Sequence, residues 1–153
     1  MRSDTANSAS GKFGGKKEGV VFLPDSATIA ISASDSGKIH VCPDLTADTV
    51  ISLPTAEVGL SYEFWYGGTA ADVQDWSIST GSNSNFYVGG IVHHDTDGEL
   101  VNVVDSDNDS NSLLGVITPI AGTKVHMVCD GVKWYVNGNV ISATNAAVTF
   151  GDA

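Results

Sequence analysis

The segment best suited to hold a metal ion is the acidic run at residues 105–111 (DSDNDSN). Oxygen-bearing side chains alternate along it at Asp105, Asp107, Asp109 and Asn111. Such alternation lets a loop wrap around calcium, but the twelve-residue EF-hand loop also needs glycine at position six and glutamate at position twelve. This chain has Ser110 and Val116 there. We therefore expect a solvated acidic loop, with a calcium site of another kind as the alternative.

Two adjacent histidines and an aspartate at residues 93–95 are the next candidates for metal binding or acid–base chemistry. Neighbouring residues of a strand point to opposite faces, so both rings can reach one ion only at a bulge or a strand end. We expect either His93 or His94 to be partly buried and the other to face solvent. For His40 and His126, which lie singly in strand-like runs, we expect structural roles.

Catalytic motifs are missing from the sequence. It contains no G-x-S-x-G element and no glycine-rich phosphate loop before a helix. Cys42 and Cys129 lie in strand-like runs without metal-ligand spacing, so we expect buried reduced thiols, with a disulfide as the alternative. We expect a protein that is not an enzyme and that carries no cofactor.

Aromatic residues gather between residues 62 and 87. Trp65, Tyr66 and Trp76, with Asp and Asn nearby, could stack on sugar rings or form an interface. Packing in the core or between subunits is the alternative interpretation, because aromatic side chains dominate both.

Short runs rich in Val, Ile, Thr and aromatic residues, separated by turn residues, must position these side chains. Turn signals recur about every 8–12 residues and no βαβ spacing occurs, so we predict an all-β fold: an antiparallel β-sandwich, jelly-roll-like or a small barrel. The predicted strands are residues 20–23, 28–32, 38–42, 49–53, 60–66, 76–79, 86–92, 100–104, 113–117, 124–129, 133–137, 139–142 and 147–150.

Two dipeptides favour tight hairpin turns near the end of the chain. Asp130-Gly131 and Asn137-Gly138 both suit the positive φ angles of type I′ turns. The pattern therefore predicts a three-stranded antiparallel meander over residues 124–142.

Charge divides the 153-residue chain into two unequal parts. Residues 1–19 show no apolar periodicity and hold four basic and two acidic residues, a net charge of +2. Residues 20–153 hold three basic and sixteen acidic residues, a net charge of −13. We predict an extended N-terminal arm, 1–19, on a single β domain, 20–153. A pI near 4.3 argues against nucleic acid and anionic membranes as partners, because both attract clustered Lys and Arg.

The arm is the first candidate for an interaction segment. Its basic residues and one aromatic residue could order on an acidic neighbour, including another copy of the chain; an ordinary disordered terminus is the alternative. The residues concerned are Arg2, Lys12, Phe13, Lys16 and Lys17.

Several segments resemble those of small virion proteins of tailed bacteriophages, in particular capsid decoration (cement) proteins and related head or fibre modules. The resemblance covers most of residues 37–138, and its motifs are structural. The segments are SGKIHV (36–41), PDLTA (43–47), ISLPTA (51–56), GLSY (59–62), FYVGG (86–90), DG (130–131), Trp134 and NG (137–138).

The resemblance implies a virion structural protein that assembles in the host cytoplasm and binds the outer surface of the capsid. It implies two partners, the major capsid protein and other copies of the chain in a homotrimer, with the arm as a tether. The alternative is a tail-fibre or head-fibre module that binds host-surface carbohydrate through residues 62–76.

Overall fold

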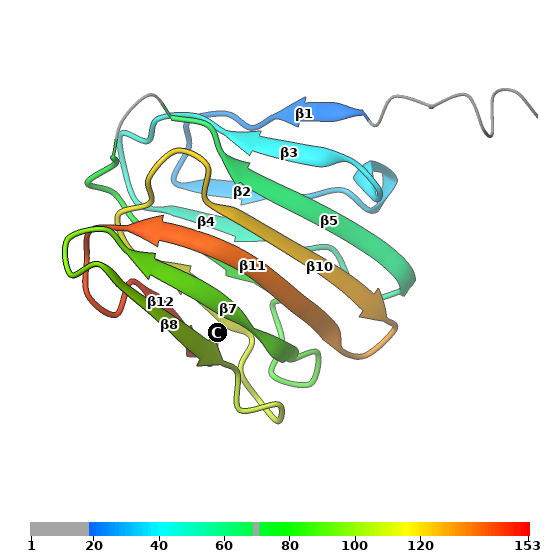
Figure 1. Ribbon diagram of the computed structural model, residues 1–153. Helices are drawn as coiled ribbons and strands as arrows, with labels where there is room; N and C mark the ends of the chain where they lie inside the picture. Colours follow the sequence, from blue (N-terminus) through cyan, green and yellow to red (C-terminus); the bar gives the residue numbers. More distant parts are fainter. Residues whose placement is uncertain (1–18, 69–70) are drawn as a thin grey trace, which may run out of the picture.

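Two facing β-sheets form the body of the protein (Figure 1). The computed structural model describes residues 19–68 and 71–153. The prediction of an all-β sandwich is confirmed, and neither sheet closes into a barrel within the described residues. In spatial order, the seven-stranded sheet consists of β1 (Val20–Phe22), β3 (Ile39–Cys42), β5 (Val58–Tyr66), β10 (Lys124–Asp130), β11 (Trp134–Ser142), β7 (Tyr87–Asp95) and β8 (Leu100–Asp105). The five-stranded sheet consists of β12 (Val148–Gly151), β9 (Leu113–Val116), β6 (Trp76–Ser79), β4 (Thr49–Ser52) and β2 (Thr28–Ala30).

Both sheets are mixed, so the expectation of purely antiparallel sheets is wrong. From β1 to β6 successive strands lie in alternate sheets. Each strand from β3 to β6 pairs in parallel with the strand two before it in the sequence: β1 with β3, β2 with β4, β3 with β5 and β4 with β6. Strands β11 and β7 are also parallel. Connections that cross to the other sheet and back allow parallel neighbours, whereas a tight hairpin forces antiparallel ones.

Alternation along each strand separates the core from the surface. In β5, Tyr62 and Phe64 point inward and are fully buried, whereas Ser61 and Glu63 point outward and are partly exposed. Full burial of a side chain such as that of Phe64 contributes roughly 1.5–3 kcal/mol to folding. The largest side chains in this core are Trp76 and Trp134, so the space between the sheets is filled chiefly by aromatic rings.

One of the two predicted hairpin turns is present. Strands β10 and β11 pair antiparallel through a turn in which Gly131 has a φ of 101°. The Asp130 carboxylate accepts hydrogen bonds from the backbone N–H groups of Val132 and Lys133, at 2.9 and 2.7 Å. This network lowers the pKa of Asp130, chiefly through the Lys133 and Val132 amides.

The turn predicted at Asn137-Gly138 is wrong, because β11 runs straight through it. Gly138 lies opposite Val125 in the ladder with β10. A Cβ atom at Gly138 would collide with the Lys124 carbonyl oxygen. This glycine therefore permits close approach of two strands, which is a different use of glycine from a turn.

Candidate functional site

One broad surface of the protein is the side of the seven-stranded sheet that faces away from the second sheet; we call it the outer face. One row of side chains crosses it in register from β1 to β8. Its members mix apolar, aromatic, cationic and amide groups: Phe22, Val41, Trp65, Lys124, Asn139, Val92 and Val103.

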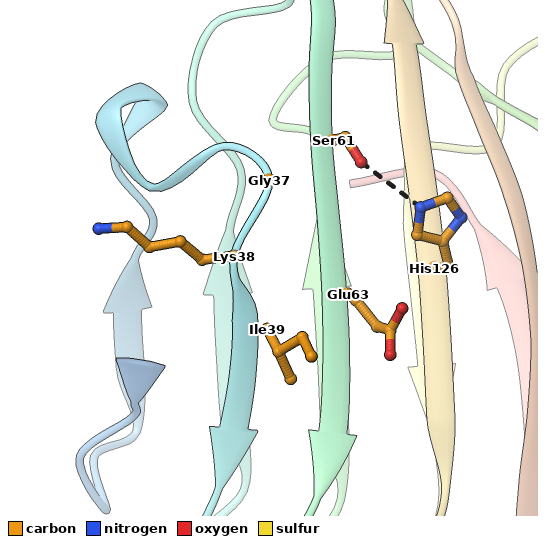
Figure 2. Close-up of a pocket in the computed structure, with 6 residues that line it drawn as sticks. All are labelled: Gly37, Lys38, Ile39, Ser61, Glu63 and His126. Atoms are coloured by element: carbon orange, nitrogen blue, oxygen red, sulfur yellow. Dashed lines mark hydrogen bonds between the residues drawn. The ribbon is translucent and has the colours of Figure 1, made fainter. Parts of the chain in front are cut away.

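A shallow hollow of about 120 Å³ lies on the outer face over β3, β5 and β10 (Figure 2). The turn before β3 and these three strands supply its lining, which consists of Gly37, Lys38, Ile39, Ser61, Glu63 and His126. The Ser61 hydroxyl and His126 Nε2 lie 3.4 Å apart, and Glu63 projects toward the same strand (Figure 2). The hollow can offer a hydroxyl, an imidazole and a carboxylate to a polar ligand.

Glu63 is held in place by two neighbours on the outer face. Trp65 Nε1 donates a 2.6 Å hydrogen bond to Glu63 Oε1, and Lys124 Nζ lies 4.0 Å from the same oxygen. Lys124 Nζ is also 5.3 Å from the centroid of the Trp65 ring, within the range of a cation–π contact. Carboxylate, indole and ammonium groups therefore form one connected cluster, in which Trp65 is partly exposed.

Lys38 lines the hollow, but its side chain points away from the other lining residues (Figure 2). Lys38 Nζ lies 2.6 Å from Asp35 Oδ1 in the 3₁₀ turn Ala33–Asp35. Its hydrogen bond is the main reason why the pKa of Asp35 is lowered. The turn thus anchors one rim of the hollow.

Of the three aromatic residues proposed as contacts, only Trp65 reaches the surface. Tyr66 and Trp76 are buried in the core, so the prediction that they are accessible for contact is wrong, and the alternative of core packing is confirmed. Trp76 meets Phe64 edge to face, with ring centroids 6.4 Å apart. Tyr66 Oη donates a 2.6 Å hydrogen bond to Asp72, and burial raises the pKa of Tyr66.

The acidic segment at residues 105–111 is organised by its own backbone. Asp107 Oδ1 accepts hydrogen bonds from the N–H groups of Asp109, Ser110 and Asn111, at 3.0 to 3.1 Å. These three amides lower the pKa of Asp107, so its carboxylate stays ionised well into acid. Asn111 in turn accepts from the Asp107 N–H at 2.9 Å, and no group of three or more metal-ligating side chains occurs among the described residues.

The histidines are placed as expected from strand alternation. His93 is fully buried, while His94 points outward and lies 3.4 Å from the Asn139 side chain. His40 is in the core and His126 lines the hollow.

Both cysteines are buried and unpaired, as predicted. Cys42 is on β3 and Cys129 is on β10, with β5 between these strands. Burial raises the pKa of the Cys42 thiol to about 12 and raises that of Cys129 as well. Neither thiol is therefore a nucleophile at neutral pH.

The basic residues proposed for the arm, Arg2, Lys12, Lys16 and Lys17, lie outside the described residues, as does Phe13.

The sequence analysis did not identify Ser61, Glu63 or Lys124 as candidate binding residues on the surface. A signal was present, because Leu60, Tyr62, Phe64 and Tyr66 alternate with the more polar set Ser61, Glu63 and Trp65. The first set forms the core side of a strand and the second its exposed side.

No protein-family model matches this chain, and no curated protein sequence matches it. Within the part of the chain that the structure describes, no helix has the length and hydropathy needed to cross a bilayer.

Proposed function

We propose that this protein is a capsid decoration protein of a tailed bacteriophage, which binds the outer surface of the head and stabilises the coat lattice. The observation that carries the proposal is the surface of the large sheet. Apolar side chains that are more than half exposed, among them Phe22, Val101 and Val103, share the outer face with charged and amide groups. Exposed apolar patches with polar surroundings are typical of protein–protein contact surfaces.

The charge distribution supports the same proposal. The body has a net charge of −13 and the arm a net charge of +2. In a lattice, the arm of one molecule would attract the body of its neighbour, whereas two bodies would repel each other. A protein that bridges coat subunits works through many modest contacts in a symmetric array. The arm then supplies one contact and the outer face another, with the major capsid protein and other copies of the chain as partners.

Removal of residues 1–19 tests the arm's part in this function. The truncated protein should fold, because the described core begins after the arm, but its occupancy on undecorated heads of the phage that encodes it should fall strongly. Occupancy is measured by sedimenting the heads and quantifying the bound chain. Full occupancy by the truncated protein would refute the arm's role.

A full-length variant separates the arm's charge from its length. Replacing Arg2, Lys12, Lys16 and Lys17 with Gln should lower occupancy, whereas Lys133→Gln should leave it unchanged. Lys133 is a suitable control because it lies in the turn between β10 and β11.

A fibre module that binds host-surface carbohydrate is the second candidate, and the partly exposed Trp65 beside the hollow favours it. The partly exposed indole could contact a sugar ring, and Glu63, Ser61 and His126 could form hydrogen bonds with its hydroxyl groups. Binding on a glycan array that disappears in Trp65→Ala and survives in Tyr135→Ala would favour this function. Tyr135 is the matched control, since it is an exposed aromatic residue on the same face.

A further inference from the structure

The seven-stranded sheet ends in two exposed edge strands, β1 at one side and β8 at the other (Figure 1). Among the described residues, no strand pairs with the outer side of either one. Proteins usually protect such edges with charged side chains, proline or a covering loop. Strand β8 instead carries Val101 and Val103, which are 65% and 66% exposed, and β1 carries Val20 and Phe22, which are 51% and 78% exposed.

The free backbone groups of β8 belong to these same residues. The Ser106 N–H donates to the Gly89 carbonyl, so residues 106 and 89 form a hydrogen-bonded pair. Because bonded and non-bonded pairs alternate in an antiparallel ladder, the N–H and C=O groups of Val101 and Val103 point away from β7.

The opposite edge has the same arrangement. The Ile39 N–H donates to the Gly19 carbonyl and the Leu23 N–H donates to the Val41 carbonyl. In a parallel ladder, alternate residues of a strand bond to one neighbour, so the N–H and C=O groups of Val20 and Phe22 point away from β3. At both edges, the residues with free backbone groups also place their side chains on the outer face.

The two edges also match in direction. Following the pairings across the sheet, β1 is antiparallel to β8. A second copy that continued the sheet beyond β8 would therefore set its β1 antiparallel to β8. The N-terminal end of the incoming β1 would then meet the C-terminal end of β8, where the acidic loop begins.

Charge favours this orientation. The end of β8 and the turn after it, which the N-terminal end of the incoming β1 would meet, carry Asp105, Asp107 and Asp109 and no Lys or Arg. The residues directly before β1 carry a net charge of +2 over residues 1–19 and include Lys16 and Lys17. Pairing β8 with β8 of another copy would instead bring two acidic edges together.

We propose that copies of this chain associate head to tail, with β1 of one copy added to β8 of the next. Val20 and Phe22 lie opposite Val103 and Val101, and their side chains form one apolar patch on the continued outer face. The N-terminal end of the incoming β1 then lies beside the start of the acidic loop after β8. Such a contact uses two different surfaces, so it generates a closed ring, as in a trimer, or an open filament.

This contact concerns only the chain itself, and it stands whether or not the assembled protein decorates a capsid. Disulfide trapping with purified protein tests its geometry. Directly opposed residues in a hydrogen-bonded antiparallel pair have Cα atoms about 5.5 Å apart, which a disulfide can span. Mixing Val20→Cys protein with Val103→Cys protein under mild oxidation should give a covalent product of twice the chain mass.

Controls make the trapping result specific. Each of the two variants oxidised alone should stay at the mass of one chain, as should a mixture of Val20→Cys with Val132→Cys, whose cysteine would lie in an exposed turn. The native cysteines are buried and do not compete. Cross-linking of Val103→Cys to itself would overturn the proposal in favour of β8–β8 pairing, and equal cross-linking of Val132→Cys would overturn it as non-specific collision.

A lysine substituted on edge strand β8 tests whether pairing at this edge stabilises the assembly. At low salt, light scattering should give the wild-type chain a mass that is a multiple of 15.8 kDa. Val103→Lys, or salt raised to about 1 M, should shift it toward one chain, because charge at an edge blocks strand addition and salt screens the arm. Val132→Lys should keep the wild-type mass. A wild type that stays at the mass of one chain at every concentration would overturn the proposal.

Discussion

His40 is a buried histidine that makes the stability of the fold depend on pH. Its ring lies 5.1 Å from that of Phe64 and 5.7 Å from that of Tyr62, and neither ring nitrogen has a hydrogen-bond partner among the described residues. Burial lowers the pKa of His40 from its ordinary 6.5, and the attraction of Asp35 only partly opposes this.

Acid should therefore destabilise the fold through His40. Because the pKa of His40 is lower in the folded chain, the unfolded chain binds the proton more readily, so stability falls as pH falls through 6.5. Denaturant unfolding at pH 7.5 and 5.5 should show a larger loss of unfolding free energy in wild type than in His40→Phe. An equal loss in both proteins would show that His40 titrates normally in the folded state.

Gly138 is required by close contact between two strands. A Cβ atom there would meet the Lys124 carbonyl oxygen and lie 3.0 Å from Val125 Cα. Gly138→Ala should lower the free energy of unfolding by about 1–3 kcal/mol, as overpacking does elsewhere. Gly151→Ala in β12, where a Cβ atom meets nothing within 4 Å, should change it by less than about 0.5 kcal/mol. Similar losses in both variants would contradict this explanation.

Sequence patterns predicted some residue positions well and others poorly. Alternation separated His93 from His94, and the place of Cys42 and Cys129 in strand-like runs without metal-ligand spacing predicted their buried thiols. The aromatic residue type alone could not tell Trp65 from Trp76, because an aromatic side chain suits both a core and a surface; the alternation along β5 is what separates Trp65 from the buried set.

At the scale of elements, most strands were predictable, but their pairing was not. Runs of β-branched and aromatic residues marked the strands closely, including β5 and β10. Strands β1, β3 and β5 become neighbours because the segments between them, β2 and β4, belong to the other sheet. Local strand propensity does not determine to which sheet a strand belongs. Asn137-Gly138 shows the same limit, since a dipeptide that suits a turn also suits a crowded strand.

The acidic loop after β8 provides a test at this scale. Asp107 ties together the backbone of residues 109–111, so Asp107→Ala should lower the melting temperature of the protein. A chelator should leave the wild-type melting curve unchanged, because the loop is closed by hydrogen bonds to its own carboxylate. A chelator-induced fall in the melting temperature would instead indicate a calcium site.

At the scale of the whole molecule, the chain divides into a +2 segment, residues 1–19, and a −13 body, residues 20–153. In the function that we propose, these opposite charges attract one another between neighbouring molecules, and salt would screen that attraction. Binding of the wild-type chain to undecorated heads should therefore weaken as salt is raised from about 0.05 to about 0.5 M. Salt-independent binding would assign the contact to the apolar outer face alone.

The arm lies outside the described residues and the class of partner stays a prediction; both rest on residue counts and charge alone. The outer face, the hollow and the matching edges could not be predicted, because each arises from strands far apart in the sequence. Phe22 and Val103, for example, become members of one row only through five intervening strands.

Electron microscopy of the phage particle tests the central claim most directly, by locating the chain and counting its copies. A decoration protein predicts hundreds of copies at local three-fold positions over the whole outer surface of the head. A few copies at one vertex or on a fibre would contradict it and identify a tail or fibre component.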